Sequence, residues 1–268
     1  MTIEVEQDGA VTVVTINRPE ARNAVNPDIA DALFRAFVDF ERDENAKVAV
    51  LTGIPGMFCA GFDLKWAAEN AGDTWFAEHE LDASFDGQDD RPRKGPMGPT
   101  RLSLSKPVIA AISGPAVAGG MELALWCDMR VMEETAYMGV YCRRWGVPLI
   151  DGGTVRLPRI VGQGRAMDLI LTGRQVQADE CLTMGLANRV CAEGTSRQTA
   201  VELAHELTRF PQACMRADRM SALRQWSLNP EHALANEWKS AETFRKEGMA
   251  GAGRFASGKG RSGDFDAI

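Results

Sequence analysis

Residues 113–128 read Ser-Gly-Pro-Ala-Val-Ala-Gly-Gly-Met-Glu-Leu-Ala-Leu-Trp-Cys-Asp and join a short apolar run to a helix-like segment through paired glycines. The apolar run, VIAAIS at 108–113, is typical of a buried parallel strand. After the glycines, MELALWC predicts a helix whose first N–H groups point outward at its positive end. Glu122 lies one helical turn further on. This segment therefore places a carboxylate beside exposed backbone donors.

A second segment repeats the order of strand, small residues and helix. MFCAGFDLK at 57–65 follows the apolar run VAVLT at 48–52 and places Ala60 and Gly61 in a turn. Two backbone donors that converge on one carbonyl oxygen form an oxyanion hole, which stabilises negative charge on a thioester. Taken separately, each segment is better explained by an ordinary tight turn with glycine capping, and Glu122 by a favourable charge in a first helical turn.

The rest of the chain indicates an α/β architecture. Residues 2–7 and 11–17 alternate around Asp8-Gly9, which predicts an antiparallel hairpin, and the apolar spacing predicts a helix over 27–42. Residues 66–105 lack periodicity, so we expect a mobile lid-like loop with a short helix near 75–81. Because the order of strand, glycine loop and helix recurs, we expect ligands at the carboxyl ends of the strands.

Further along, the pattern becomes mainly helical. A helical pair is expected at 164–171 and 178–184, followed by a small strand in LANRV at 186–190. Residues 195–247 are predicted to be almost wholly helical. The glycine-rich tail, 248–268, is predicted to be flexible unless another part of the protein holds it in place.

Composition excludes several classes of protein. The chain has 268 residues, 45% hydrophobic and 25% charged, with a formal charge of −7, so it can bury a large core without disulfides. It has no CxxC pair, no basic cluster suited to nucleic acid and no apolar stretch of ~18 residues that could span a membrane. A cytoplasmic location fits best. Phosphate-loop, serine-hydrolase and dinucleotide motifs are missing. The histidines are separated along the chain and are expected to be surface or packing residues: His79, His205 and His232.

Four stretches together resemble the crotonase (enoyl-CoA hydratase/isomerase) family. They are NRPEARNAVN at 17–26, FCAGFDLK at 58–65, GPAVAGGMELALWCD at 114–128 and LTGRQVQADECLTMGLANRV at 171–190. The resemblance implies an α/β fold with a crotonase-like ββα spiral core over 1–195 and a helical C-terminal trimerisation region over 196–268. It also implies a homotrimer or a dimer of trimers.

The resemblance also implies site residues. The oxyanion-hole amides would be those of Phe62 and Gly119, and Glu122 would be the acid/base. The family's coenzyme A contacts fall on a set of residues from two loops: Arg22, Ala24, Ala60, Asp63, Leu64 and Lys65. Arg22 and Lys65 could supply charge to phosphates, although Lys65 is equally a solvated surface cation. Phe255 and Lys259 match the family's adenine contacts only loosely.

One position departs from the family pattern. Its hydratases use a second glutamate, and Cys142 stands at that position. A thiol, with an ordinary pKa of ~8.5, is a poor substitute for a carboxylate in deprotonating water, so we expect Cys142 to be a small buried filler. Asp151 is either the replacement acid/base or a helix N-cap. Arg143 and Arg144 either hold an acidic acyl group or play a structural part.

The resemblance thus implies an acyl-CoA enzyme of the enoyl-CoA hydratase/isomerase type that stabilises a thioester enolate. No metal or redox cofactor is implied, since coenzyme A arrives as part of the substrate. Because of Cys142, an isomerase, hydrolase or lyase acting on another acyl-CoA is the alternative. A non-catalytic acyl-CoA binding protein is an alternative of another class, although pure binding would not need Glu122.

Overall fold

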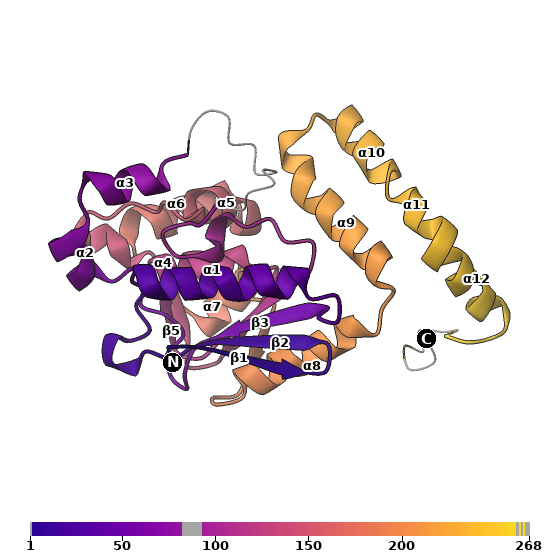
Figure 1. Cartoon of the computed structure of the whole chain (residues 1–268), viewed down its shortest axis with the longest axis horizontal. Coiled ribbons are helices and arrows are strands. Elements are labelled where there is room, and N and C mark those ends of the chain that lie inside the picture. The colour runs from indigo at the N-terminus through magenta and orange to yellow at the C-terminus, as the bar shows by residue number, and fades with distance from the viewer. Residues whose placement is uncertain (1, 82–92, 261–262, 264, 266–268) are drawn as a thin grey trace. The chain divides into compact units, whose positions relative to one another are not determined.

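The computed structural model describes residues 2–81, 93–260, 263 and 265 (Figure 1). The chain forms two compact units, Met1–Ala204 and His205–Ile268. The domain division expected after residue 195 precedes helix α8 (Ser196–Thr208), and the compact units divide within that helix.

The main sheet of the first unit has the order β1-β2-β3-β4-β6-β9. Strands β1 and β2 form the predicted antiparallel hairpin, and the remaining neighbours pair in parallel. Strands β3 and β4 are buried along their whole length, as expected for parallel strands covered on both faces. The bounds are β1 (Ile3–Asp8), β2 (Val11–Ile16), β3 (Val48–Thr52), β4 (Val108–Ile112), β6 (Met129–Glu133) and β9 (Arg189–Cys191).

A second, small sheet has the order β5-β7-β8, with bounds β5 (Pro115–Val117), β7 (Tyr137–Gly139) and β8 (Gln175–Gln177). Strand β5 follows β4 after a sharp turn at Gly114, whose φ is +71°. A Cβ at Gly114 would lie 2.1 Å from the carbonyl oxygen of Gly56, so only glycine fits. These three-residue strands were not predicted because they are too short to show alternation.

Helices cover the main sheet and connect its strands. Helix α1 (Pro27–Arg42) has the predicted bounds, begins at the N-cap Asn26, and packs near β1 and β2 (Figure 1). Its apolar face buries Leu33 and Phe37. Other helices of this part are α4 (Gly119–Trp126), α5 (Gly153–Val161), α6 (Gln163–Thr172) and α7 (Ala178–Thr183).

Residues 66–105 contain more helix than the sequence predicted. Helix α2 (Leu64–Asn70) continues past Trp66, α3 (Asp73–His79) takes the place of the short helix expected near 75–81, and η2 (Pro99–Arg101) precedes β4. The expected short helix is therefore present as α3, and the prediction that the rest of the segment is loop is wrong at α2 and η2. Asp63 explains part of the difference, since its carboxylate caps α2 by accepting from the N–H groups of Lys65 and Trp66. The lid prediction falls partly on residues 82–92, which lie outside the described residues.

The second unit is helical, as expected, but the tail differs from the prediction. Helix α12 (Met249–Ala256) occupies part of the segment predicted to be flexible and continues the π-helix η5 (Phe244–Gly248) without a break. Extending an existing helix fixes only one residue at a time, which lets the glycine-rich sequence stay helical. Glu247 on η5 also accepts hydrogen bonds from the N–H groups of Ala213 and Cys214 at the start of α9.

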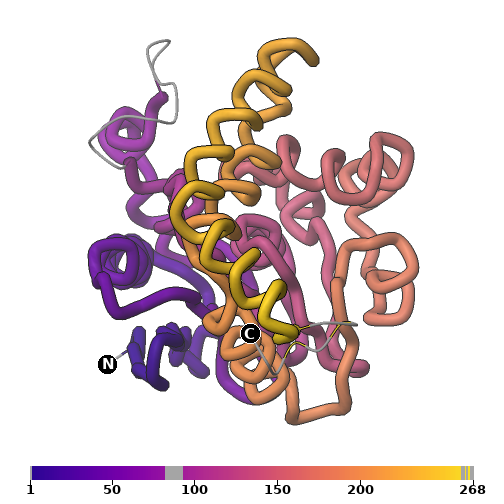
Figure 2. The backbone as a smooth tube through the Cα atoms, turned by 90° about the vertical axis from the view of Figure 1, so that its right-hand side faces the viewer, coloured from indigo at the N-terminus to yellow at the C-terminus, as the bar shows by residue number. Residues whose placement is uncertain are grey.

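Figure 2 shows the helices of this unit in orange and yellow. They are α9 (Gln212–Arg224), α10 (Pro230–Trp238), α11 (Ala241–Thr243) and α12. The last residues of the predicted tail, 261–262, 264 and 266–268, lie outside the described residues. The homotrimer, or dimer of trimers, stays a prediction.

Candidate active site

The two glycine-bearing turns lie against each other in the structure. Cys59 donates its N–H to the Pro115 carbonyl at 3.0 Å, and Val117 donates to the Cys59 carbonyl at 3.1 Å. A Cβ on Gly61, whose φ is +100°, would lie 2.9 Å from the Gly119 nitrogen. Residue 61 must therefore stay small for the turns to approach this closely.

The amides of Phe62 and Gly119 belong to the two turns that lie against each other. Gly119 is the first residue of α4, so its N–H has no carbonyl one turn earlier to bond. The N–H groups on either side of Phe62 are engaged, Gly61 with the Cys59 sulfur and Asp63 with the Val25 carbonyl. No loop or turn hydrogen bond from the Phe62 amide occurs among the described residues. Both residues line the same cavity.

A buried asparagine ties the first loop to this arrangement. Asn23 is fully buried with a φ of +56°. Its side-chain amide donates to the carbonyls of Met57 (3.0 Å) and Phe58 (3.1 Å), and its own carbonyl accepts from the Cys59 thiol. The loop that the sequence assigned to coenzyme A is thus fixed to the turn that carries Phe62.

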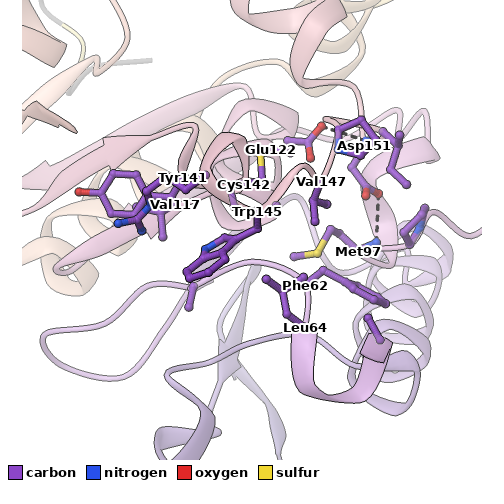
Figure 3. A pocket seen from close by; sticks show the side chains of 18 of the residues that line it. Phe62, Leu64, Met97, Val117, Glu122, Tyr141, Cys142, Trp145, Val147 and Asp151 are labelled. Atoms are coloured by element: carbon purple, nitrogen blue, oxygen red, sulfur yellow. Dashed lines mark hydrogen bonds between the residues drawn. The ribbon is translucent and has the colours of Figure 1, made fainter. Parts of the chain in front are cut away.

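Glu122 extends from α4 into the cavity and is 3% exposed (Figure 3). Its Oε1 accepts hydrogen bonds from the N–H groups of Asp151 (2.9 Å) and Gly153 (2.8 Å). No hydrogen bond from another described residue reaches Oε2. Burial and the negative charge of Asp151 raise the pKa of Glu122 to about 7, against the two hydrogen bonds and Arg156, which lower it. Two hydrogen bonds therefore fix the Oε1 atom of Glu122, and the pKa of its carboxyl lies near neutral pH.

Asp151 lies beside Glu122 and also lines the cavity (Figure 3). The N-cap interpretation is wrong, since α5 begins at Gly153 and its N-cap is Gly152. The Oδ1 atom of Asp151 instead accepts from the Met97 N–H at 3.0 Å and from the Thr100 hydroxyl. Burial raises the pKa of Asp151, although these hydrogen bonds and nearby arginines oppose the shift.

Thr100 and Arg156 support both acids, and the sequence reasoning missed them. Arg156 donates to the carbonyls of Asp151 (2.9 Å) and Thr100 (2.6 Å). It therefore holds the backbone turn whose N–H groups bind Glu122. Neither residue belongs to a motif, and Thr100 lies far from residue 151 in the chain, so no local signal could have found them.

The cavity has a volume of about 570 Å³ and is mostly apolar. Met97 and Val117 lie near the acids, while Leu64 and Trp75 come from the helices after the Phe62 turn. Its size is typical of sites for organic ligands. Two acids, Glu122 and Asp151, thus line one mostly apolar pocket together with Phe62 and Gly119.

The family model for enoyl-CoA hydratase/isomerase matches residues 6–256 of this chain. The chain belongs to the enoyl-CoA hydratase/isomerase family. It is 34% identical to "Enoyl-CoA hydratase EchA19" of Mycobacterium tuberculosis, over 85% of this chain and 82% of that one. It is also 33% identical to the "Short-chain-enoyl-CoA hydratase" of Clostridium acetobutylicum, over 90% of this chain and 89% of that one.

A crystal structure of an enoyl-CoA hydratase from Mycobacterium tuberculosis H37Rv superposes with a TM-score of 0.82. The sequences are 32% identical, and the match covers 96% of each chain. The predicted crotonase fold is therefore confirmed, and this enoyl-CoA hydratase/isomerase family member is an enzyme. Its described residues include no helix long and apolar enough to cross a membrane.

Cys142 lies on η3 (Tyr141–Trp145) of this enzyme and is 7% exposed. Burial and the nearby charge of Glu122 raise the pKa of its thiol, so the thiol stays protonated at neutral pH. The interpretation as a buried filler agrees with this position. Arg143 donates to the Ile170 carbonyl at 3.0 Å, and the guanidinium of Arg144 lies over the Tyr141 ring.

The six residues that resemble coenzyme A contacts divide into two groups in this family member. Arg22, Ala60 and Leu64 line the cavity. The others do not: Ala24 is buried, Asp63 caps α2 and pairs with Arg18 at 2.7 Å, and Lys65 is an exposed residue of α2. Arg18, which also donates to the Ala24 carbonyl at 2.9 Å, thus links the two loops and was not singled out from the sequence.

Proposed function

We propose that this enzyme acts on enoyl-CoA thioesters and moves a proton to or from the carbon next to the thioester carbonyl. The N–H groups of Phe62 and Gly119 bind the thioester oxygen and stabilise the negative charge of the enolate. Glu122 carries the proton. Coenzyme A arrives as part of the substrate, and no separate cofactor takes part.

The arrangement of the Glu122 carboxylate is the observation that carries this proposal. Two N–H groups fix Oε1, while Oε2 accepts no hydrogen bond from the described residues, and the side chain lines the cavity that Phe62 and Gly119 share. A pKa of about 7 gives comparable amounts of acid and base at neutral pH. A general acid/base is most effective when its pKa lies near the working pH.

Coenzyme A recognition is a second part of the proposal. Arg22 lines the cavity beside Ala60 and is exposed at the surface, so its guanidinium can reach both solvent and a bound thioester. It supplies positive charge to the phosphates of coenzyme A. Lys65 adds charge from α2, and Ala24, Asp63 and Leu64 shape the loops around the pantetheine arm.

Two reactions pass through an enolate of the thioester, which is a dienolate in isomerisation. In hydration, a base takes a proton from water as the water oxygen bonds to the β-carbon, and Glu122 then delivers a proton to the α-carbon of the enolate. In isomerisation, a base takes a proton from the γ-carbon and the acid returns one to the α-carbon, so the double bond moves and no water is added.

The protonated thiol of Cys142 favours isomerisation as the second candidate function. It stands where the family's hydratases have a carboxylate to activate water, and burial keeps it from ionising. Asp151, the other acid among the described residues that line the cavity, is the candidate partner for Glu122 in either reaction. Product mass separates the two reactions, because hydration adds one water and isomerisation leaves the mass unchanged.

Replacement of Glu122 tests the central step. Glu122→Gln keeps an oxygen that accepts from Asp151 and Gly153, so acyl-CoA binding should change little. Exchange of α-protons for deuterium should fall by about 10²–10⁴-fold, the usual loss for a general acid/base. Glu134→Gln, at an exposed glutamate on the same chain, is the matched control.

Retained exchange in Glu122→Gln would assign the proton transfer to another residue, with Asp151 tested next. If the unmodified enzyme binds no acyl-CoA in calorimetry and exchanges no α-proton, the proposal is wrong as a whole.

A further inference from the structure

Trp145 presents a large unpaired aromatic surface to the cavity. Its side chain lines the cavity although it is 66% exposed. Among the described residues, its ring makes no contact with another aromatic ring, and its one cation contact is with the Arg144 guanidinium, 5.9 Å from the ring centre. A tryptophan in water leaves apolar area that a ligand can bury favourably.

Arg144 supports Trp145 from one side. The Arg144 guanidinium also lies 4.5 Å from the centre of the Tyr141 ring, and the Tyr141 hydroxyl donates to Gln175 at 2.9 Å. Such cation–π contacts hold side chains in place at modest energy. The Arg144 guanidinium therefore contacts both rings, which restrains the orientation of Trp145 before a ligand binds.

A separate segment supplies the opposite wall of the cavity. Phe62 and Leu64 lie below Trp145 in Figure 3, at the turn that leads into α2. The Phe62 ring is itself packed, 5.3 Å from the Trp75 ring and 5.9 Å from the Trp66 ring. Trp75 in turn stacks on His79 at 4.5 Å. The Phe62 ring thus packs against other aromatic rings of the protein, whereas the Trp145 ring packs against none among the described residues.

Resting on the proposed function, we propose that the acyl group of the substrate carries a planar aromatic ring that stacks on Trp145. The thioester end lies at Phe62, Gly119 and Glu122, and the ring occupies the space between the two walls. A flat ring gains a stacking contribution that a linear chain of equal carbon number lacks. The cavity volume of about 570 Å³ accommodates such a group.

Binding of two saturated thioesters tests this assignment without requiring turnover. The probes are dihydrocinnamoyl-CoA and the linear saturated acyl-CoA with the same number of acyl carbons, measured by calorimetry. The enzyme should bind the aromatic thioester roughly 2- to 12-fold more tightly, the range that corresponds to one aromatic stacking contact. Trp145→Leu should abolish this preference for the aromatic thioester, and Trp145→Phe should keep most of it.

Trp238→Leu is the matched control, since Trp238 is 78% exposed on α10 and does not line the cavity. Equal affinity for the two thioesters, or a linear preference, overturns the inference. So does a Trp145→Leu variant that retains the ratio or weakens both ligands alike. If neither thioester binds the unmodified enzyme, the proposed function itself is wrong, which separates its failure from that of the ring assignment.

Discussion

Asp151 donates its backbone N–H to Glu122 Oε1 at 2.9 Å, and its own carboxylate lies close enough to raise the pKa of Glu122. The same residue therefore orients the Glu122 carboxylate and adjusts its proton affinity. These two effects can be separated, because the first belongs to the backbone and the second to the side chain.

Asp151→Asn should lower the pH at which α-proton exchange reaches half of its maximum. Exchange uses deprotonated Glu122, so its rate should rise with pH through a midpoint near 7 in the unmodified enzyme. An asparagine oxygen can still accept from Met97 and Thr100, while the negative charge is removed. A pH profile of deuterium exchange measures the midpoint. An unchanged or higher midpoint would show that the Asp151 charge does not act on Glu122.

Glu122→Gln should stabilise the protein at neutral and alkaline pH. The folded-state pKa of Glu122 is raised from 4.5 to about 7, so the folded state holds the extra proton between these values and loses stability as pH rises through them. A shift of this size corresponds to at most about 3 kcal/mol in the free energy of unfolding. Urea unfolding at about pH 5 and about pH 8 measures the difference.

In that experiment Glu122→Gln should raise the free energy of unfolding only slightly at about pH 5 and most at about pH 8. Glu134→Gln should show no such dependence. An equal increase in the free energy of unfolding at both pH values would indicate altered packing rather than loss of the titrating Glu122 carboxyl.

Cys142→Glu should increase hydration of crotonyl-CoA. The new carboxylate would lie near Glu122, as the thiol does, and could deprotonate a water molecule that the thiol cannot. Cys142→Gln, of nearly equal size but without a base, is the control. The hydration rate is followed by loss of the enoyl absorbance. The interpretation of position 142 is wrong if the two variants hydrate crotonyl-CoA at the same rate. It is also wrong if the enzyme with its native Cys142 hydrates crotonyl-CoA rapidly and still does so after Asp151 is replaced.

Arg22→Ala should weaken acyl-CoA binding by roughly tenfold, the usual contribution of a hydrogen bond to a charged group. It should also reduce the dependence of the dissociation constant on salt, because one phosphate contact is lost. Titrations at several ionic strengths measure both effects. Arg35→Ala, at an exposed position on α1 outside the cavity, should leave them unchanged. Equal salt dependence in both variants would place the phosphates elsewhere.

The sequence was sufficient for the features that rest on local patterns. The β1–β2 hairpin, α1 and the turns at Gly61 and Gly119 follow from alternation, periodicity and glycine. It was not sufficient where contacts join distant segments. Thr100 reaches Asp151 across many residues, and Cys59 is hydrogen-bonded to Pro115 and Val117 of strand β5. No window of sequence contains either partner pair.

The position of Asp151 illustrates the same limit. Its setting before Gly-Gly-Thr predicted a helix cap as readily as a catalytic acid, since capping is a local property. The structure excludes the cap because Met97 and Thr100, from another segment, occupy its carboxylate. The tail shows the opposite error, where composition suggested flexibility and α12 formed as an extension of an earlier helix.

The amides of Phe62 and Gly119 belong to the main chain, so nearly every side-chain substitution at residue 62 leaves its donor present. Only proline lacks the N–H. Evolution can thus sample new side chains at residue 62 of the cavity while its backbone donor is inherited unchanged. In a laboratory library, variation at residue 62 combined with Leu64 and Trp145 would diversify acyl-group preference, and proline alone at residue 62 would remove the donor outright.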